Sequence, residues 1–374
     1  MRLELIFLAT THGPSDHLNV AIDERETKTI LFSKTKTFED LQSSSGVDIL
    51  LLDSLLNDTF AVYDPKSLVV AARCDSAKAL EIKNEYGFQE VYSFSEPQEK
   101  DFFEIQKGDD IYIMPKNAFI QKDRILYPNN TRIHSRLWQY GKRLSCENVT
   151  MVRNTTKVVI SHSDMPLVAF VRDLILRRGS IPFIVSGTLL GWYRECSIIP
   201  HTRDMDFASF HYECPFDMLN IINTLELPWL WPYREYGRPD DNWSFTMEIR
   251  GNSTFWIDIF TMYYDEKRNV NFVSALAGLQ KMKYTYTRFD TLCAVDLLNY
   301  VFYAPCDPEA YIRADYGPDW RIDVNSLKYH YDTSPKNAEK NGKFLAKEKS
   351  EVIREGLWDK YPRKNNKRKS ERKV

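Results

Sequence analysis

Two aspartates separated by one residue, Asp204 and Asp206, constrain the fold of this chain more than any other feature. Side chains of a strand alternate between its two faces, so on an extended segment both carboxylates point the same way. Asp258 stands between two isoleucines, a pattern typical of a buried strand, and it can complete the cluster from a neighbouring strand. Three carboxylates gathered in this way suit a hard cation, Mg²⁺ or Mn²⁺, that holds a substrate phosphate. The sequence therefore predicts a metal site built from strands.

The segment before these aspartates reads as a strand followed by a helix. Residues Ile181 to Val185 predict a buried strand, and a helix is expected over Leu189 to Arg194. Between them, Gly187 and Thr188 are small enough for backbone N–H groups to approach a phosphate at the start of the helix. The guanidinium of Arg194 can bind a phosphate with two parallel hydrogen bonds, or it can form an ordinary salt bridge at the helix end. We predict Gly187, Thr188 and Arg194 as substrate-binding residues, with the salt bridge as the alternative for Arg194.

Three strands are predicted to follow, over Asp204 to Phe210, Trp243 to Ile249 and Thr254 to Met262. Alternation along the last of them puts Asp258 on a face with two aromatic residues, opposite the face of its isoleucine neighbours. Because an unpaired buried carboxylate is costly, Asp258 needs a partner. A bound cation and an arginine of the core both meet that need, and the sequence leaves the two open.

Length and pattern predict two domains. With 374 residues and 43% hydrophobic content, the chain can bury a sizeable core. Residues 1–120 predict a small α/β domain, residues 121–156 a connection, residues 157–335 the catalytic domain, and residues 336–374 a charged, partly disordered tail. The catalytic domain is expected to open with a helix that has Asp164 as its N-cap and ends at Gly179. In the first domain we expect strands over Leu5 to Ala9, Thr29 to Phe32, Leu68 to Ala72 and Ile111 to Met114, and a helix over Asp75 to Tyr86.

The charge is unevenly distributed along the chain. The net charge is -2, but the last fifteen residues alone carry eight Lys or Arg and one Glu, which leaves the body of the protein acidic. Nucleic-acid backbones need clustered Lys and Arg, so we expect no nucleic-acid partner. The basic tail is predicted to be a solvated end, with a membrane-surface contact or a nuclear signal as alternatives.

The number of N-glycosylation sequons in the chain indicates the cellular compartment in which the protein is found. Six asparagines head N-x-S/T triplets, whereas about two or three are expected by chance, which favours the lumen of the secretory pathway. They are Asn57, Asn129, Asn148, Asn154, Asn242 and Asn252. No run of about 18 apolar residues occurs, so we expect any membrane association to come from a segment that this chain does not contain. The six cysteines have no zinc-ligand spacing, and one or two disulfides or free thiols remain open.

Two motifs carry a resemblance to a known family. The gapless stretch from Ser186 to Asp206, S-G-T-L-L-G-W-Y-R-E-C-S-I-I-P-H-T-R-D-M-D, is the first. The second runs from Ala304 to Ile312 and continues at Tyr316 and Gly317. Both resemble signatures of the fukutin and LicD family of nucleotidyltransferase-fold enzymes, and fukutin more than bacterial LicD. The resemblance covers about 157 to 330 and implies an α/β (α+β) fold, with a nucleotidyltransferase-like mixed sheet and flanking helices in the C-terminal half.

The resemblance also implies an activity, a phosphotransferase that takes a CDP-linked small molecule as donor and a glycan or glycoprotein as acceptor. Members like fukutin transfer ribitol 5-phosphate in the Golgi lumen, and bacterial relatives attach phosphocholine. Asp204 and Asp206 would hold the metal ion, and Asp258 would complete a second metal site or accept the proton of the acceptor hydroxyl. Where LicD proteins carry additional acidic residues, this chain has His201, Thr202 and Arg203, which leaves the number of metal ions open.

Other readings of the same residues remain. A non-catalytic relative that binds glycans or assists a partner enzyme is the main alternative, although the three retained aspartates argue against it. A glycosyltransferase of unrelated fold that also uses D-x-D is disfavoured, because its D-x-D does not normally follow such a helix start. Cys196 and Cys306 lie in the two motifs, so that either a disulfide between them or two buried thiols is expected.

Overall fold

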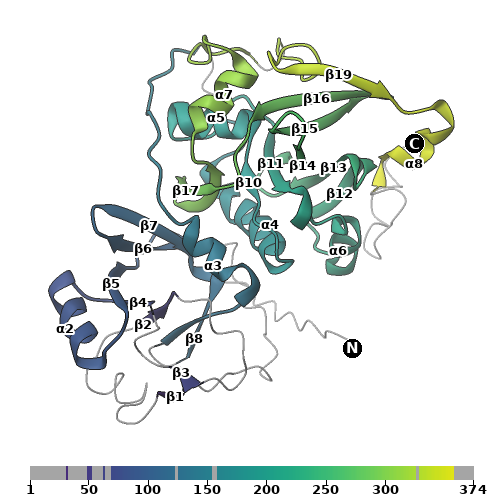
Figure 1. Cartoon of the computed structure of the whole chain (residues 1–374). Helices are drawn as coiled ribbons and strands as arrows, with labels where there is room; N and C mark the ends of the chain where they lie inside the picture. Colours follow the sequence, from purple (N-terminus) through teal and green to yellow (C-terminus); the bar gives the residue numbers. More distant parts are fainter. Residues whose placement is uncertain are drawn as a thin grey trace.

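The structure is a computed structural model and describes residues 31–32, 49–52, 62–63, 69–122, 125–153, 158–325 and 328–357. These residues form two α/β parts, an N-terminal part built on a seven-stranded sheet and a C-terminal part built on a nine-stranded sheet. Figure 1 shows the N-terminal part in purple and blue beside the larger C-terminal part in teal to yellow. The mixed α/β class expected from the sequence is thus confirmed.

The N-terminal sheet has the strand order β7, β6, β5, β4, β2, β9, β8. Its strands are β2 (Ile49–Leu51), β4 (Val69–Ala72), β5 (Glu90–Ser95), β6 (Phe102–Lys107), β7 (Asp110–Pro115), β8 (Phe119–Lys122) and β9 (Ile125–Pro128), and β1 (Leu31–Phe32) and β3 (Val62–Tyr63) form a separate parallel pair. Helix α2 (Ser76–Tyr86) begins at the predicted place, because the Asp75 carboxylate accepts a hydrogen bond from the backbone N–H of Lys78 at 2.8 Å. It ends at Gly87, whose φ of 73° suits a residue without a Cβ.

Two of the strands predicted for this part are confirmed, as β4 and β7. The strand predicted over Leu5 to Ala9 lies outside the described residues, and of Thr29 to Phe32 only the last two residues are described. The N-terminal sheet continues past residue 120, because β8 and β9 are its last two strands. Helix α3 (Thr131–Gln139) follows them, within the segment predicted as the connection.

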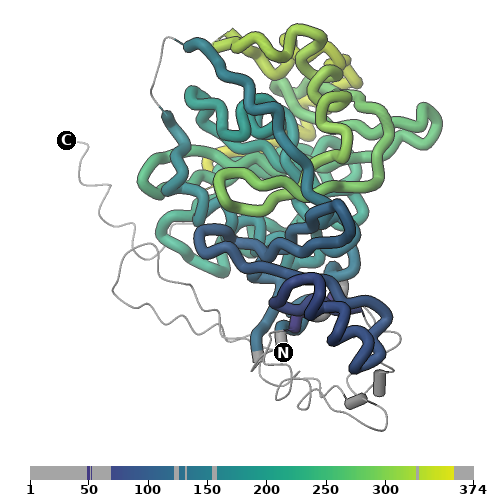
Figure 2. The backbone as a smooth tube through the Cα atoms, turned by 90° about the vertical axis from the view of Figure 1, so that its left-hand side faces the viewer, coloured from purple at the N-terminus to yellow at the C-terminus, as the bar shows by residue number. Residues whose placement is uncertain are grey.

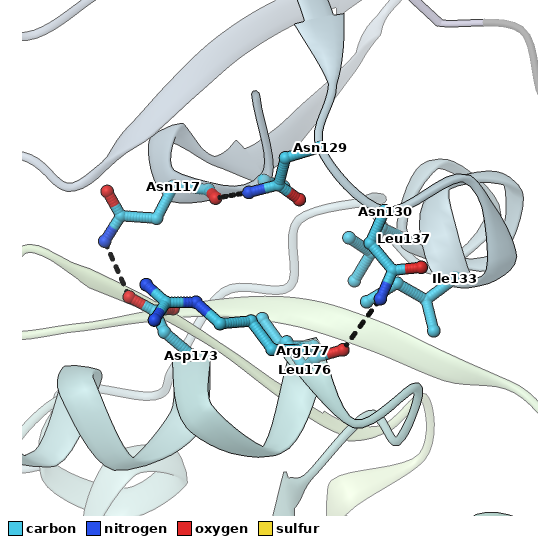
Figure 3. A pocket seen from close by; sticks show the side chains of 9 residues that line it. Asn117, Asn129, Asn130, Ile133, Leu137, Asp173, Leu176 and Arg177 are labelled. Atoms are coloured by element: carbon cyan, nitrogen blue, oxygen red, sulfur yellow. Dashed lines mark hydrogen bonds between the residues drawn. The ribbon is translucent and has the colours of Figure 1, made fainter. Parts of the chain in front are cut away.

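Helix α4 (Met165–Arg177) lies where the two parts meet. The side-chain amide of Asn117 donates a hydrogen bond to Asp173 of this helix at 2.6 Å, and that of Asn130 donates to the carbonyl of Leu176 at 3.3 Å (Figure 3). One hydrophobic cluster continues from the N-terminal sheet into the C-terminal part. Figure 2 shows the two parts again in direct contact after a quarter turn. The boundary is therefore packed over a continuous core.

The start of α4 differs in detail from the expectation. Asp164 precedes the helix and ends a short 3-10 turn, η4 (His162–Asp164), but its side chain does not cap α4. The carboxylate instead accepts hydrogen bonds from the backbone N–H of Ser161 at 3.0 Å and from the hydroxyl of Ser253 at 2.8 Å. Gly179, with φ of 84°, follows the helix as predicted.

The C-terminal sheet runs β19, β16, β15, β14, β13, β12, β20, with β11 paired in parallel to β14 and β10 paired to β11. Its strands are β10 (Phe183–Ile184), β11 (Asp204–Phe210), β12 (Leu230–Arg238), β13 (Asp241–Arg250), β14 (Thr254–Asp265), β15 (Val270–Ala277), β16 (Gln280–Thr287), β19 (Ala338–Lys343) and β20 (Ile353–Glu355). The remaining elements are α5 (Ser186–Glu195), η5 (His211–Glu213), α6 (Met218–Leu225), the hairpin β17 (Leu292–Leu297) and β18 (Tyr300–Pro305), α7 (Pro308–Tyr316), η6 (Ala346–Glu348) and α8 (Lys349–Val352).

Residues 338–355, which fall in the predicted tail, tie the two ends of this sheet together. β19 pairs with β16 at one end, and β20 pairs with β12 at the other. Figure 1 shows this yellow segment passing from β19 to α8. A small second core beneath it contains Leu276, Phe344 and Val352. In the described part of the chain, no helix combines the length and the apolar character needed to cross a membrane.

Candidate active site

The three aspartates of the sequence pattern meet at the junction of β11 and β14. Asp204, Asp206 and Asp258, here called the carboxylate trio, each offer an oxygen, and these oxygens lie within 4.8 Å of one another. The two strands are parallel, and Asp206 stands directly opposite Asp258 in their register. Asp258 is 6% exposed, whereas the other two are half-buried, so the cluster is open on one side.

Alternation along the two strands produces this arrangement. On β11, Met205 and Phe207 turn into the core with 0% and 2% exposure, which places the carboxylates on the opposite face. On β14, Ile257 and Ile259 are fully buried, and Asp258 points the other way. The predicted alternation of β14 is therefore confirmed.

The carboxylate trio carries more negative charge than its surroundings neutralise. Burial raises the pKa of Asp206 well above its usual value, and the charges of Asp204 and Asp258 raise it further, against a hydrogen bond from Gly187. Burial also raises the pKa of Asp258, although the nearby Arg234 opposes this effect. Three clustered carboxylates, of which Asp258 is paired with Arg234, are an oxygen-rich donor set, which fits a divalent cation such as Mg²⁺ or Mn²⁺.

Gly187 and Thr188 lie beside the carboxylate trio, in the first turn of α5. This helix begins at Ser186, three residues before the predicted start. The backbone N–H of Gly187 donates to Asp206 Oδ2 at 3.1 Å, and the Thr188 hydroxyl accepts from the backbone N–H of Asp206 at 2.8 Å. A Cβ atom at Gly187 would lie 3.4 Å from Asp206 Oδ2, an ordinary van der Waals contact, so the helix start lies close beside the carboxylate. In this structure both residues therefore orient Asp206, and a direct contact with phosphate stays a prediction.

Arg194 lies at the opposite end of α5 and is 1% exposed. Its guanidinium donates to Glu195 at 2.6 Å, to Asp323 at 3.3 Å and to the carbonyl of Trp320 at 3.1 Å. Arg153 joins the same network through Glu195 and Asp323. A guanidinium whose donors are already used inside the protein has little to offer a substrate. The environment of Arg194 thus favours the salt-bridge alternative over the predicted phosphate contact.

Arg234 and Thr246 are at the site although the sequence did not single them out. The Thr246 hydroxyl donates a hydrogen bond to Asp258 and accepts one from Arg234 Nε at 2.8 Å. Arg234 Nη2 lies 3.4 Å from Asp258 Oδ1. Of the two partners left open for Asp258, the arginine is present, and it comes from β12, a strand that the sequence pattern did not place.

The second motif comes close to the first because α7 packs against α5. A Cβ atom at Gly187 would lie 4.0 Å from the hydroxyl of Tyr316, the last residue of α7. The preceding residue, Asp315, is 3% exposed and accepts a hydrogen bond from the Tyr286 hydroxyl at 2.8 Å. Burial raises the pKa of Asp315 to about 7. Tyrosines and one buried acid thus bound the site on the side of α7.

The cysteines of the two motifs do not pair with each other. Cys196 forms a disulfide with Cys146, and Cys306 forms one with Cys293. The expected alternatives for Cys196 and Cys306, a mutual disulfide or two free thiols, are both wrong. The first bridge fixes the segment after the N-terminal part to the end of α5, and the second joins β17 to the residue after β18.

Comparisons with known proteins identify the family of the chain. A profile described as the LicD/FKTN/FKRP nucleotidyltransferase domain matches residues 181–307, which include the carboxylate trio. An uncharacterized protein of Caenorhabditis elegans is 30% identical over 271 residues, which cover 71% of this chain and 69% of that protein. The chain belongs to the LicD and fukutin family. This membership confirms the resemblance noted in the sequence.

Other relatives in the family match shorter parts. A second uncharacterized protein of C. elegans is 32% identical over 225 residues, 58% of each chain. The human ribitol-5-phosphate transferase FKTN is 31% identical over 179 residues, which cover 48% of this chain and 37% of the transferase. The chain thus spans well under half of the length of the relative whose name states an activity. Because a member of the family is a transferase, the comparison supports the prediction that this protein is an enzyme.

Proposed function

We propose that this protein is a metal-dependent phosphotransferase of fukutin type. It would move an alditol phosphate, of the ribitol 5-phosphate kind, from a CDP-activated donor to a hydroxyl of a glycan or glycoprotein. The observation that supports this proposal most is the carboxylate trio, three acids within 4.8 Å of one another on adjacent strands of a family member. Such a cluster costs folding energy unless a cation is present to balance it.

Each residue of the site has a part in this proposal. Asp204 and Asp206, with Asp258, would hold Mg²⁺ or Mn²⁺, which when bound neutralises charge on the donor's pyrophosphate. Gly187 and Thr188 keep the Asp206 side chain and backbone in place. Thr202 does the same for Asp204 through a hydrogen bond of 2.7 Å. Residues fixed before substrate arrives lose no orientational freedom during the reaction.

The transfer itself exchanges one phosphorus–oxygen bond for another. The acceptor oxygen forms a bond to the phosphorus nearest the alditol, and the bond from that phosphorus to the CMP leaving group breaks. The hydroxyl proton must pass to a base, and Asp258 would take that role in the alternative in which Asp204 and Asp206 alone hold the metal ion.

A direct assay tests the proposal. The purified chain is incubated with Mn²⁺ or Mg²⁺, glycan acceptors and a panel of CDP-ribitol, CDP-glycerol and CDP-choline, and CMP release is measured. We expect metal-dependent release that is largest with a CDP-alditol and is abolished by EDTA. Glycan binding without CMP release from any donor would favour the alternative of a non-catalytic accessory protein.

We also propose that the protein works in the lumen of the Golgi or endoplasmic reticulum. The two disulfides support this, because such bonds persist in oxidising compartments. The sequons differ in accessibility: Asn148 is exposed, whereas Asn242 is 3% exposed and donates to the carbonyl of Ala275. We expect Asn148→Gln to remove one peptide-N-glycosidase-sensitive mobility shift and Asn242→Gln to remove none. A native protein without any shift would contradict a lumenal location.

A further inference from the structure

A row of polar side chains crosses the sheet from the carboxylate trio to Arg234. The strand registers place Asp206 opposite Asp258, Asp258 opposite Thr246, and Thr246 opposite Arg234. Residues directly opposite on neighbouring strands project from the same face of the sheet. The row therefore runs over β11, β14, β13 and β12 and ends in a positive charge.

Arg234 is held firmly but remains accessible. Its Nε is bound to the Thr246 hydroxyl at 2.8 Å, and its guanidinium carbon lies 5.4 Å from the ring centre of Tyr236 and 5.9 Å from that of Tyr233. Its side chain keeps 37% of its exposure, while that of Asp258 keeps only 9%. The contact between the two, at 3.4 Å, is longer than the 2.7 to 2.9 Å typical of a strong charged hydrogen bond. Arg234 is therefore not fully used in neutralising Asp258, and its side chain stays partly accessible to a ligand.

We propose that Arg234 is a phosphate-binding residue of the donor site and that Thr246 is its positioning residue, a role that rests on the proposed phosphotransferase function. The planar guanidinium of Arg234 can donate parallel hydrogen bonds to two oxygens of one phosphate. Arg234 lies on β12 directly opposite Thr246 of β13, whose hydroxyl donates to Asp258. Its place in the row puts a positive charge next to the position where the trio would gather a pyrophosphate. Arg234 thus takes the role that sequence reasoning gave to Arg194.

Binding of three probes tests this role without turnover. Pyrophosphate, CDP and cytidine are titrated by calorimetry into the full chain with saturating Mn²⁺, for the wild type, Arg234→Gln, Arg234→Lys and Thr246→Val. We expect Arg234→Gln to weaken pyrophosphate and CDP by about 10- to 100-fold, because a hydrogen bond to a charged group is lost. Cytidine, which lacks phosphate, should bind unchanged. Arg234→Lys should recover part of the loss, and Thr246→Val should show a smaller loss in the same two probes.

Arg250→Gln is the matched control. Arg250 is also a partly buried strand arginine with an acidic partner, Glu248 at 2.7 Å, but it lies four residues further along β13 from Thr246. Its replacement should leave all three affinities unchanged.

Equal pyrophosphate affinity in the wild type and Arg234→Gln would overturn the assignment, and so would a wild type that binds no pyrophosphate. An Arg234→Gln chain that binds Mn²⁺ more tightly but keeps its pyrophosphate affinity would make Arg234 only a counter-charge for Asp258. A wild type that binds CDP no better than pyrophosphate would instead contradict the choice of a CDP-linked donor. In that case the pyrophosphate affinities of the wild type and Arg234→Gln would still decide the role of Arg234.

Discussion

Two buried clusters of charge in this protein differ in how their acids are held. In the first, here called the Arg172 cluster, Arg172 is 1% exposed and donates to Asp101 at 2.7 Å and to Asp173 at 2.6 Å. The remaining Asp101 oxygen accepts the backbone N–H of Val301 at 2.7 Å. In the carboxylate trio, the oxygens of three acids lie within 4.8 Å of one another, and Arg234 lies 3.4 Å from one of them, Asp258. The first cluster keeps one net negative charge, but its two acids are hydrogen-bonded by Arg172, by the backbone N–H of Val301 and by Asn117, whereas the second gathers three acids around a single ion pair.

The difference between the two clusters shows how acids that stabilise the fold can be distinguished from acids that could bind a ligand. The Arg172 cluster joins the two parts of the molecule, because Asp101 lies between β5 and β6 while Arg172 is on α4. A buried pair with good geometry fixes one arrangement, and breaking it is costly. Mutual repulsion among the three acids of the trio opposes folding, and under the proposed function a bound cation would offset this repulsion.

The largest expected effect comes from removing charge from the trio. Asp204→Asn and Asp206→Asn should each reduce transfer by on the order of 1000-fold, because a charged ligand of the cation is lost. Since repulsion is relieved, the melting temperature of Asp206→Asn in EDTA should equal or exceed that of the wild type. CMP release and thermal melts measure the two effects, with the exposed Asp240→Asn as control. Wild-type turnover in either trio variant would break the comparison.

Replacing Arg172 should have the opposite result, a loss of stability with little change in transfer activity. We expect Arg172→Met to lower the free energy of unfolding by about 3–5 kcal/mol, because two acids lose their partner in a buried place. Transfer per folded molecule should stay near the wild-type value. Arg178→Met, which breaks a half-exposed pair with Asp217, should change stability by less than about 1 kcal/mol. Chemical denaturation checks both variants, and equal losses in the two would contradict the assignment.

Asp315 sharpens the comparison because, among the described residues, it is a buried acid with no ion-pair partner. Burial raises its pKa to about 7 in the folded state, well above the usual value of 3.8 for an aspartate, against hydrogen bonds from Tyr286 and Asn337. The raised folded value means that this group favours folding most below about pH 4 and that the benefit is lost as pH rises through 7. The loss is on the order of 4 kcal/mol.

The measurement compares the free energy of unfolding at pH 5 and pH 8. In the wild type it should fall over this range more steeply than in Asp315→Asn, whose amide does not ionise. Identical slopes in the two proteins would show that Asp315 is ionised in the folded state at both pH values.

The smallest of these effects is expected at Arg194. Arg194→Ala should lower the free energy of unfolding by about 2–3 kcal/mol, less than for Arg172, because Arg153 still neutralises Glu195 and Asp323. Arg194→Lys should recover part of the stability. The donor KM should not change in either variant. An increased donor KM at unchanged stability would restore the phosphate-binding role predicted from the sequence.

Local patterns in the sequence predicted several secondary-structure elements correctly. The strand β11, the alternation of β14 and the helix α2 follow from periodicity, which acts over a few residues. The start of α5 was missed by three residues, because Ser186 has a positive φ of 46° and gives no standard capping signal. Neither disulfide could be deduced, since cysteine spacing does not determine connectivity.

The sequence by itself determined that Asp204 and Asp206 share a face of a strand and that Asp258, once buried, needs a partner. Only the tertiary structure decided which arginine meets them. Strand register and strand order are set by packing over long sequence separations, and they bring Arg234 to Asp258 while a helix end takes Arg194 into a separate network. The local sequence places the acids on one face of their strands, whereas the pairing of distant strands decides which arginine lies beside them.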